Sequence, residues 1–559
     1  MLRTIPRILA LVGLLAASAF ADDPRPAESA SRPLKADGRY LILPVSGKSQ
    51  VRRVQVATND GIVRDFDIRL GDGPPDFLTF LDLEPFRGQS LTITSKLPGG
   101  SEALAGIKSS DQFPDEKNLY AEADRPQFHF TSRRGWLNDP NGLVWHDGEY
   151  HLFYQHNPYG WDWGNMHWGH ATSPDLIHWK ELPIALYPRK YGDWAFSGSA
   201  VVDHANTSGF GSVDRPAMVG AYTSTGRGEC IIWSVDRGRT WTEFAGNPVV
   251  KHNGRDPRLL WHEPTKRWIM AVYEEGDGKD RAIAFHSSPD LKAWTMESRI
   301  DGFYECPDLF ELPVQGSKPP RSLWVLSAAD GKYRLGQFDG HKFTPETPKL
   351  TLWHGDFYAA QTFSDTPDGR RIQIGWARGV DFPGMPFNQQ MTIPCELTLR
   401  TTPDGPRLYA EPVAEVAKLY DKSRTWARSS AGRDDDDLGS VLPRIESAEG
   451  VDLTITARGE AEGGWTATLY GSKVEYDPAK RVLNVAGLEV PLKAEAEQVS
   501  VRILADRRSL EVFGNNGQVA ASRRVVRKPG APALEIITSG VADRFRALRI
   551  SDHTLKSAW

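Results

Sequence analysis

The segment SPDLIHWKEL, residues 173–182, carries a theme of Ser, then Asp, then Trp that returns later in the chain. It recurs in SVDRGRTWTEF (234–244) and SSPDLKAWTMES (287–298), and more weakly in FDGHKFTP (338–345). Runs such as PAMVGAYTS and RWIMAVYEE, which lie between the copies, are typical of short strands. A unit of several short strands that recurs about every fifty residues is typical of a β-propeller blade. The repeat therefore predicts a five-bladed β-propeller over residues 123–408.

Alternating apolar and polar side chains predict further β domains on both sides of the propeller. Before it, YLILPVSG and SLTITSK alternate between turn residues, which predicts a small N-terminal β-sandwich over residues 39–122. After it, VDLTITARG and WTATLYGS follow the same pattern, which predicts a C-terminal β-sandwich over residues 441–559. The predicted fold class is all-β.

Two further segments are predicted to lie outside these domains. Residues 22–38 are rich in Pro, Ala, Ser and Asp, which predicts a flexible lead-in. Residues 409–440 are predicted to be a linker with a short helix, because EPVAEVAKLYDKSRTW has helix-forming composition. We interpret the acidic run at 434–437 as a solvated charge run, with a calcium site as the alternative.

The first 21 residues, MLRTIPRILALVGLLAASAFA, have the three parts of a secretory signal peptide. Arg3 and Arg7 precede a short apolar run, and a small-x-small cleavage site ends at Ala21. This pattern predicts export to the periplasm or the cell exterior. The apolar run is too short to cross a bilayer and no later segment approaches the required length, so we expect no membrane span.

The amino-acid composition limits which kinds of molecule the protein is expected to bind. The chain has 559 residues and a net charge of −5 without a Lys/Arg cluster, which argues against nucleic-acid binding. Its three cysteines, Cys230, Cys306 and Cys395, allow at most one disulfide, so we expect the apolar core to hold the fold. The 18 Trp residues offer flat apolar faces of the kind that suits sugar rings. The sequence indicates no particular oligomeric state.

Three carboxylates are followed by Pro, or in the case of Glu305 by Cys-Pro, at predicted strand starts. Asp139 lies in WLNDPNG (136–142), Asp256 in GRDPRLLW and Glu305 in FYECPDLF. The residues of WLNDPNG suit a tight turn, which we expect to present Asp139. Since Pro fixes its own φ and lacks an N–H group, it suits a strand start and favours an extended carboxylate residue before it. A propeller gathers the starts of its inner strands around a central channel, where the three carboxylates are predicted to meet.

Such a set fits the chemistry of acetal cleavage. Cleavage with retention requires a carboxylate nucleophile and a carboxylic acid about 5 Å apart. Asp139, next to turn N–H groups, suits the ionised nucleophile, and Glu305, flanked by aromatic residues, suits the proton donor. We expect Arg255 to keep Asp256 charged and positioned.

At this point the ordered motifs resemble those of glycoside hydrolase family 32, which contains invertases, inulinases and levanases. The matching motifs cover about residues 125–555 and are, in chain order, WLNDPNG, FSGS (196–199), RDP (255–257), EC (305–306), DFYAAQTF (356–363), IGW (374–376) and DRRSLEVFGNNG (506–517). The segment before residue 125 lies outside the core family pattern and is similar to an extra module of some bacterial levanase-like members.

The resemblance implies roles for individual residues. Asp139 corresponds to the nucleophile, Glu305 to the general acid/base and Asp256 to the transition-state stabiliser that binds fructosyl hydroxyls. The positions implied for the fructose-binding subsite are Asn138, Gln155, Trp163, Phe196, Ser197, Arg255, Tyr358 and Trp376. The implied reaction is hydrolysis through a covalent fructosyl-enzyme, with no metal or organic cofactor. Fructans, either levan or inulin, and sucrose all fit the pattern as substrates.

Three alternatives stay open at the level of sequence. A fructosyltransferase uses the same three carboxylates but passes fructose to a sugar acceptor. A non-catalytic carbohydrate-binding propeller needs none of them, whereas all three are present. A sialidase would need a tyrosine nucleophile and an arginine cluster, and the sequence offers no identifiable cluster of that kind.

Overall fold

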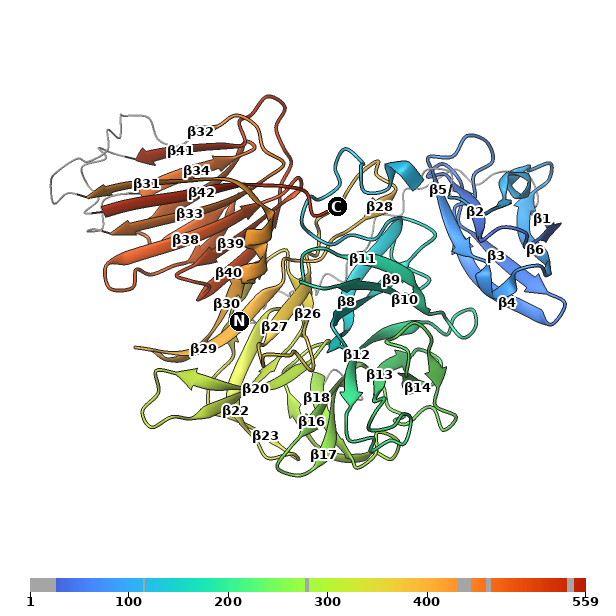
Figure 1. The fold of residues 1–559 in the computed structure, drawn as a ribbon, viewed down its shortest axis with the longest axis horizontal. Helices are drawn as coiled ribbons and strands as arrows, with labels where there is room; N and C mark the ends of the chain where they lie inside the picture. Colours follow the sequence, from blue (N-terminus) through green and yellow to red (C-terminus); the bar gives the residue numbers. More distant parts are fainter. Residues whose placement is uncertain (1–26, 114–115, 277–280, 430–443, 459–463, 540–546) are drawn as a thin grey trace, which may run out of the picture. The chain divides into compact units, whose positions relative to one another are not determined.

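The computed structural model describes residues 27–113, 116–276, 281–429, 444–458, 464–539 and 547–559 (Figure 1). The chain divides into two compact units, residues 1–113 and 114–559, and each is described by itself. The predicted signal peptide and the acidic run at 434–437 lie outside the described residues. Among the helices of the described ranges, none is long and apolar enough to cross a membrane.

Residues 27–113 of the first unit form two antiparallel sheets, with strand orders β1-β6-β3-β4 and β5-β2-β7. Burial alternates along β5 and β6, as the period-two sequence pattern predicts. The strands are β1 (Ala27–Lys35), β2 (Tyr40–Val45), β3 (Arg52–Thr58), β4 (Gly61–Ile68), β5 (Phe77–Asp82), β6 (Ser90–Pro98) and β7 (Lys108–Ser110). Short 3₁₀ turns span Glu84–Phe86 and Ala103–Gly106.

The prediction of a flexible lead-in over residues 22–38 was wrong for its described part. Residues 27–35 form strand β1, which pairs in register with all of β6, from Ala27 opposite Pro98 to Lys35 opposite Ser90. The composition of this segment is poor in apolar residues, but backbone pairing with a neighbouring strand does not require apolar side chains on an exposed edge. Tertiary pairing therefore overrides the local composition.

In the second unit, the described residues between 135 and 412 form sheets in which most neighbouring strands are successive and antiparallel, while β28 pairs with β8 and β29 with β20 in parallel. Three are separate sheets, with orders β11-β10-β9-β8-β28, β12-β13-β14-β15 and β16-β17-β18-β19; a larger one runs β23-β22-β21-β20-β29-β27-β26. The first three contain β8 (Gly135–His146), β9 (Glu149–Asn157), β10 (His167–Ser173), β11 (Lys180–Leu186), β28 (Phe387–Asn388), β12 (Ala195–Asp203), β13 (Ala217–Ser224), β14 (Gly228–Ser234), β15 (Thr242–Glu243), β16 (Gly254–His262), β17 (Arg267–Glu275), β18 (Arg281–Ser288) and β19 (Thr295–Asp301). The larger sheet and its side strands contain β20 (Asp308–Gln315), β21 (Ser322–Ser327), β22 (Lys332–Phe338), β23 (Phe343–Pro345), β24 (Leu350–Thr351), β26 (Tyr358–Thr362), β27 (Ile372–Trp376), β29 (Cys395–Thr402) and β30 (Gly405–Pro412).

The Ser-Asp-Trp repeat forms the turn between the third and fourth strands of these sheets. In the copy at 173–182, Asp175 accepts hydrogen bonds from backbone N–H groups, and Trp179 Nε1 donates to the Leu176 carbonyl at 2.9 Å. The corresponding indole bonds run from Trp241 to the Gly238 carbonyl and from Trp294 to the Leu291 carbonyl. The repeat is thus a recurring turn in which the carboxylate satisfies backbone donors.

The innermost strands pack around a shared centre (Figure 1). Strand β8 contacts β12 and β26, β12 contacts β16, and β20 contacts both β16 and β26. Since these strands come from different sheets, side chains at their starts converge although they are far apart in sequence. The prediction of a β-propeller is confirmed by this arrangement of sheets around one centre.

A β-sandwich follows the propeller (Figure 1). Within the described residues one sheet has the order β25-β40-β39-β38-β33-β42-β31 and the other β32-β41-β34-β35-β36-β37, with an apolar core between them. The strands are β25 (Trp353–Gly355), β31 (Tyr420–Ser429), β32 (Arg444–Ile445), β33 (Gly450–Arg458), β34 (Gly464–Leu469), β35 (Ser472–Asp477), β36 (Val482–Val485), β37 (Leu488–Pro491), β38 (Gln498–Ala505), β39 (Ser509–Gly514), β40 (Val519–Arg524), β41 (Leu534–Ser539) and β42 (Ala547–Leu555).

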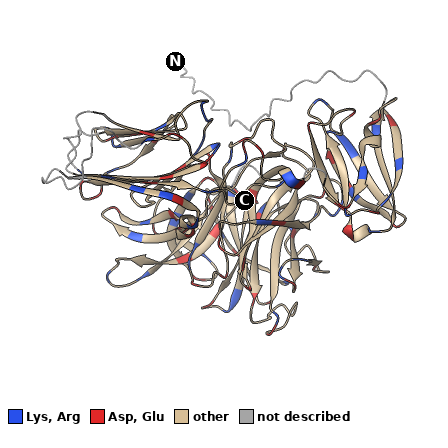
Figure 2. Cartoon of the chain, turned by 45° about the horizontal axis from the view of Figure 1, so that its top comes forward, with Lys and Arg blue, Asp and Glu red and all other residues tan. Residues whose placement is uncertain are grey.

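The predicted linker over residues 409–440 is only partly a linker. Its short helix exists as a 3₁₀ turn, Ala414–Leu419, but the following residues form β31 and pair with β42 of the sandwich. Helix-forming composition is a weak preference that an available sheet edge overrides. A further 3₁₀ turn, Glu116–Asn118, precedes the propeller. Figure 2 shows acidic and basic residues interspersed over the strands and loops of both units.

Candidate active site

Strands of the propeller carry a β-bulge at the end where the predicted site residues lie. The register shifts between Leu137 and Pro140 in β8, between Ala195 and Gly198 in β12, and between Arg255 and Arg258 in β16. A bulge leaves a residue unpaired and re-aims its side chain, and bulges are common next to active sites. The equivalent shift in β26 lies between Tyr358 and Gln361. At one end of the channel, bulges in four strands thus change the directions of side chains from those that regular pairing would give.

The bulges correct two predictions about the backbone. WLNDPNG was predicted to be a tight turn, but it lies inside the continuous strand β8. Asp256 and Glu305 were predicted to be extended, but their φ angles are +68° and +52°, and Cys306 follows at +43°. Left-handed backbone is uncommon for residues other than glycine, and such strain concentrates at functional sites. The following prolines, Pro257 and Pro307, therefore do not hold Asp256 and Glu305 in an extended conformation.

Asp139 is held by side-chain donors. Ser197 Oγ donates to Asp139 Oδ2 at 2.6 Å, and Asn138 Nδ2 donates to Oδ1 at 3.0 Å. Burial raises the pKa of Asp139, the two hydrogen bonds counteract this rise, and the nearby charge of Glu305 raises the pKa further. The donors that favour its carboxylate form are thus Ser197 and Asn138 rather than the turn N–H groups that the sequence suggested.

Asp256 lies beside Asp139, and one thiol contacts both. Cys306 Sγ lies 3.5 Å from Asp256 Oδ2 and 3.7 Å from Asp139 Oδ2. The backbone N–H of Cys306 also donates to Asp256 Oδ2 at 3.1 Å, and the Asp256 N–H donates to Thr223 Oγ1. Burial, followed by the charges of Glu305 and Asp139, raises the pKa of Asp256 to about 8. Asp256 therefore holds its proton at neutral pH.

Arg255 does not act as predicted. We expected it to keep Asp256 ionised, but its guanidinium donates to Glu305 Oε1 instead, from Nη2 at 2.6 Å and from Nε at 3.2 Å. Tyr358 OH donates to Glu305 Oε2 at 2.7 Å, so both carboxylate oxygens are bound. The attraction of Arg255 lowers the pKa of Asp256, but burial and two neighbouring carboxylates outweigh it.

Aromatic side chains surround the carboxylates. Trp163, 45% exposed, packs edge-on against Phe196 and Trp194. On another side, Trp376 packs edge-on against Tyr358 and donates from Nε1 to Gln389 Oε1 at 2.9 Å. Because Phe196 is adjacent to Ser197 and Tyr358 bonds to Glu305, both groups of rings border the acidic centre.

Of the remaining predicted residues, Gln155 is buried on β9 and donates from Nε2 to the Ala195 carbonyl at 3.0 Å. This bond joins β9 to the bulge of β12. Asn138 accepts a hydrogen bond from Trp136 Nε1 at 2.9 Å, which fixes its amide toward Asp139. The structure therefore brings the predicted residues to one end of the channel, with Gln155 in a supporting position.

Sequence reasoning missed Cys306 and Glu275 as members of the site. Cys306 bridges the two aspartates, and Glu275 Oε1 lies 3.5 Å from Arg255 Nη1 and Nη2. Cys306 lies in the motif FYECPDLF directly after Glu305, and this position could have indicated that it belongs to the site. Glu275 stands 30 residues before Glu305, and no local pattern marks it.

Comparisons with known proteins agree with this geometry. The family model "Glycosyl hydrolases family 32 N-terminal domain" matches residues 129–412, and "Glycosyl hydrolases family 32 C terminal" matches residues 471–552. The chain belongs to glycosyl hydrolase family 32. The N-terminal match covers the whole acidic centre, and the C-terminal match lies in the sandwich.

Relatives within family 32 span most of the chain. A levanase of Bacillus subtilis is 37% identical over 497 residues, 79% of this chain and 72% of that protein. An extracellular exo-inulinase of Aspergillus niger is 31% identical over 543 residues, 82% of this chain and 98% of that protein. The crystal structure of an exo-inulinase from Aspergillus awamori matches with a TM-score of 0.69 and 27% identity, covering 79% of this chain and all of that one.

Proposed function

We propose that this family 32 protein is a β-fructofuranosidase that hydrolyses fructans and sucrose and releases fructose. The observation that carries the proposal is the acidic centre in which Cys306 contacts both Asp139 and Asp256, while Arg255 and Tyr358 bind Glu305, the residue next to Cys306. Relatives described as levanase, exo-inulinase and invertase support fructose-releasing hydrolysis.

In the proposed mechanism Asp139 attacks the anomeric carbon of the fructosyl unit. Its hydrogen bonds from Ser197 and Asn138 favour the carboxylate form that a nucleophile needs. Glu305 gives its proton to the departing oxygen, and a covalent fructosyl-enzyme forms. Glu305 then takes a proton from water, which attacks the same carbon and releases fructose with net retention.

Asp256 is proposed to bind hydroxyl groups of the fructosyl ring. Because the pKa of Asp256 is about 8, its side chain carries a proton at neutral pH and can donate one hydrogen bond and accept another. The exposed Trp163 and the neighbouring Phe196 are proposed to contact the apolar face of the same sugar. Arg255 and Tyr358 orient Glu305.

We also propose the number of propeller blades, the nature of the N-terminal module and export from the cell. The ring of contacts among β8, β12, β16, β20 and β26 supports five blades, with β26, β27, β29 and β30 as the last. The two sheets within residues 27–113 are proposed to form the N-terminal β-sandwich module, which was predicted at 39–122, and to favour polymeric substrate. Export is supported by the relative from Aspergillus niger, which is an extracellular exo-inulinase.

The test uses purified full-length protein with levan, inulin and sucrose, and analyses the products by chromatography. Free fructose as the main product supports the proposal, whereas growing oligosaccharides from concentrated sucrose would identify a fructosyltransferase. Asp139→Asn and Glu305→Gln should each lower kcat at least about 10³-fold with an unchanged melting temperature. Near-normal turnover in either variant would remove that residue from its role.

A further inference from the structure

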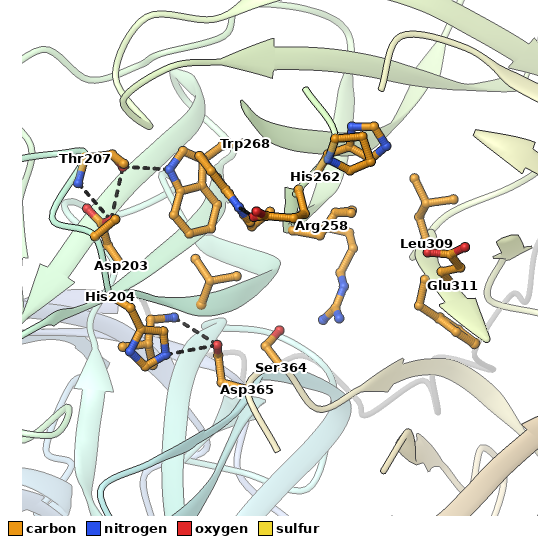
Figure 3. Close-up of a pocket in the computed structure, with 18 of the residues that line it drawn as sticks. Asp203, His204, Thr207, Arg258, His262, Trp268, Leu309, Glu311, Ser364 and Asp365 are labelled. Atoms are coloured by element: carbon orange, nitrogen blue, oxygen red, sulfur yellow. Dashed lines mark hydrogen bonds and ion pairs between the residues drawn. The ribbon is translucent and has the colours of Figure 1, made fainter. Parts of the chain in front are cut away.

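A second cavity lies at the opposite ends of the strands that carry the active site. It encloses about 420 Å³ and is lined by residues at the ends of β12 and β16 and after β26 (Figure 3). Asp203 stands six residues after Ser197, and His262 six residues after Asp256. At roughly 3.3 Å per residue, Asp203 and His262 lie about 20 Å along the strands from the acidic centre, whereas Arg258, at the near wall, lies about 7 Å from Asp256.

A buried ion pair lies between the two sites. Arg258 Nε is 2.9 Å from Asp308 Oδ1, with the two side chains 2% and 0% exposed. Thr362 joins the pair, since its N–H donates to Asp308 Oδ2 and its carbonyl accepts from Arg258 Nη1. Arg258 also lines the cavity, two residues after Asp256, and Asp308 lies three residues after Glu305. The ion pair therefore forms the wall of the cavity on the side of the acidic centre.

Most charges around the cavity are already compensated. His204 pairs with Asp365 at 3.3 Å, as the dashed lines of Figure 3 show, and Asp365 also accepts from the Val202 N–H. Asp203 accepts hydrogen bonds from the backbone and hydroxyl groups of Thr207 and Ser208. The lining therefore has no excess of positive or of negative charge that would attract a strongly charged ligand.

The open hydrogen-bonding groups are of both kinds. Among the described residues, the exposed Glu311 carboxylate and the Ser364 hydroxyl have no side-chain partner. Arg371 Nε is buried without an acceptor, although its Nη1 donates to the Phe363 carbonyl. The cavity thus presents a carboxylate acceptor and a hydroxyl, which can both donate and accept, to a ligand.

Apolar ring surface completes the wall. Trp261 is partly buried and packs edge-on against Trp268, with ring centroids 5.1 Å apart. Leu260 and Pro264 also line the cavity. Flat apolar surface beside mixed donors and acceptors matches a neutral sugar, whose rings have C–H faces and hydroxyl edges. The volume lies at the lower end of the range for small-molecule sites.

We propose that this cavity is a second sugar-binding site, which accepts a neutral mono- or disaccharide at the end of the channel opposite the catalytic centre. Glu311 and Ser364 bind its hydroxyl groups, and Trp261 contacts its apolar face. The proposal requires only that a sugar binds at this cavity. It can therefore be tested independently of the catalytic roles of Asp139 and Glu305.

Hydrogen–deuterium exchange read by mass spectrometry can locate both sites in one sucrose titration. Full-length Asp139→Asn protein is used, so that sucrose is not consumed. Peptides covering 203–209 and 262–266 should gain saturable protection, and peptides at 135–142 report the catalytic centre separately. In this background Glu311→Ala should raise the half-saturating sucrose concentration at the cavity peptides roughly tenfold, the equivalent of one lost hydrogen bond to a charged group.

Gln315→Ala is the matched control, since Gln315 is an exposed residue of the same strand outside the cavity. It should leave the cavity titration unchanged, as Glu311→Ala should leave the catalytic peptides unchanged. Protection at 203–209 and 262–266 that rises without saturation, or that is equal in both variants, overturns the proposal. Absence of protection at 135–142 alone would count against the proposed function instead.

Discussion

Arg255 binds Glu305 while it also faces Glu275. Its guanidinium lies 2.6 Å from Glu305 Oε1 and 3.5 Å from Glu275 Oε1, and its Cζ is 4.8 Å and 5.7 Å from the ring centroids of Tyr273 and Tyr304. Tyr273 OH donates to Glu275 Oε1 at 2.9 Å, which keeps that carboxylate in place. Two carboxylates thus share one cation at the edge of the acidic centre.

This sharing predicts that Glu275→Gln lowers activity more than it changes the fold. Without the second carboxylate, Arg255 loses one of the two groups that hold its guanidinium, so Glu305 is positioned less firmly. The value of kcat/KM should fall by less than about tenfold, because partly exposed charges interact through a high effective dielectric. Glu274→Gln, next in the chain but paired with Arg299, is the control. Equal kcat/KM in both variants would contradict the coupling.

Asp256→Asn should raise stability while it lowers activity. The folded-state pKa of Asp256 is about 8, above the ordinary value of 3.8, so the folded state binds this proton more tightly than the unfolded state. Stability contributed by this group therefore falls as pH rises from about 4 to about 8, and the penalty is complete above pH 8. Asn carries no such penalty.

The measurement is the melting temperature of both proteins from pH 4 to pH 9. The two curves should coincide near pH 4 and separate by several degrees at pH 8, with Asp256→Asn the more stable. Activity of the variant should be at least about 10²-fold lower. A wild-type curve parallel to that of Asp256→Asn would show that Asp256 titrates normally.

The contrast between Asp139 and Arg255 shows what the sequence could and could not indicate. The position of Asp139 follows from its motif, because the motif lies at the start of an inner strand. The partner of Arg255 does not, since bulges and left-handed backbone at Asp256 and Glu305 turn the neighbouring side chains away from the directions that a regular strand would give them. Local pattern predicts which residues meet, while bulge geometry sets which pairs form.

In the fold, too, locally determined features could be predicted from the sequence, whereas features that depend on distant partners could not. The turns built on Asp175, Asp236 and Asp290 repeat locally, so spacing alone reveals them. Strand β1 and strand β31 were missed because each is defined by a partner strand far along the chain, β6 and β42 respectively. Pairing over such separations leaves no periodic trace in composition.

His129 is predicted to make stability depend on pH where the propeller meets the sandwich. It is buried, with Nδ1 at 2.8 Å from Asp506 and Nε2 at 3.6 Å from Glu511, both on the sandwich side. Burial lowers the pKa of His129, but the two carboxylates outweigh burial and raise it to about 9. The folded state therefore retains a proton that the unfolded state loses, and stability falls between about pH 6.5 and pH 9.

His129→Gln tests this contact. The variant should be less stable than wild type at pH 6, because it leaves two buried carboxylates without a cation, at a cost of about 3–5 kcal/mol. It should also lack the decline between pH 6.5 and pH 9 that this group contributes. Thermal unfolding at closely spaced pH values measures both effects. A decline of the same size in the variant would place its origin elsewhere.

The buried pair Arg258 and Asp308 predicts a stability loss that a second substitution restores. Arg258→Met leaves the Asp308 carboxylate buried without its cation, which should destabilise the fold by about 3–5 kcal/mol. Arg258→Met combined with Asp308→Asn removes both charges and keeps an oxygen acceptor for the Thr362 N–H, so most of the loss should return. Arg299→Met, which breaks an exposed pair with Glu274, is the control and should cost less than about 1 kcal/mol. Denaturant unfolding followed by near-UV circular dichroism compares the variants, and a double variant no more stable than Arg258→Met would mean that shape, rather than the unpaired charge, causes the loss.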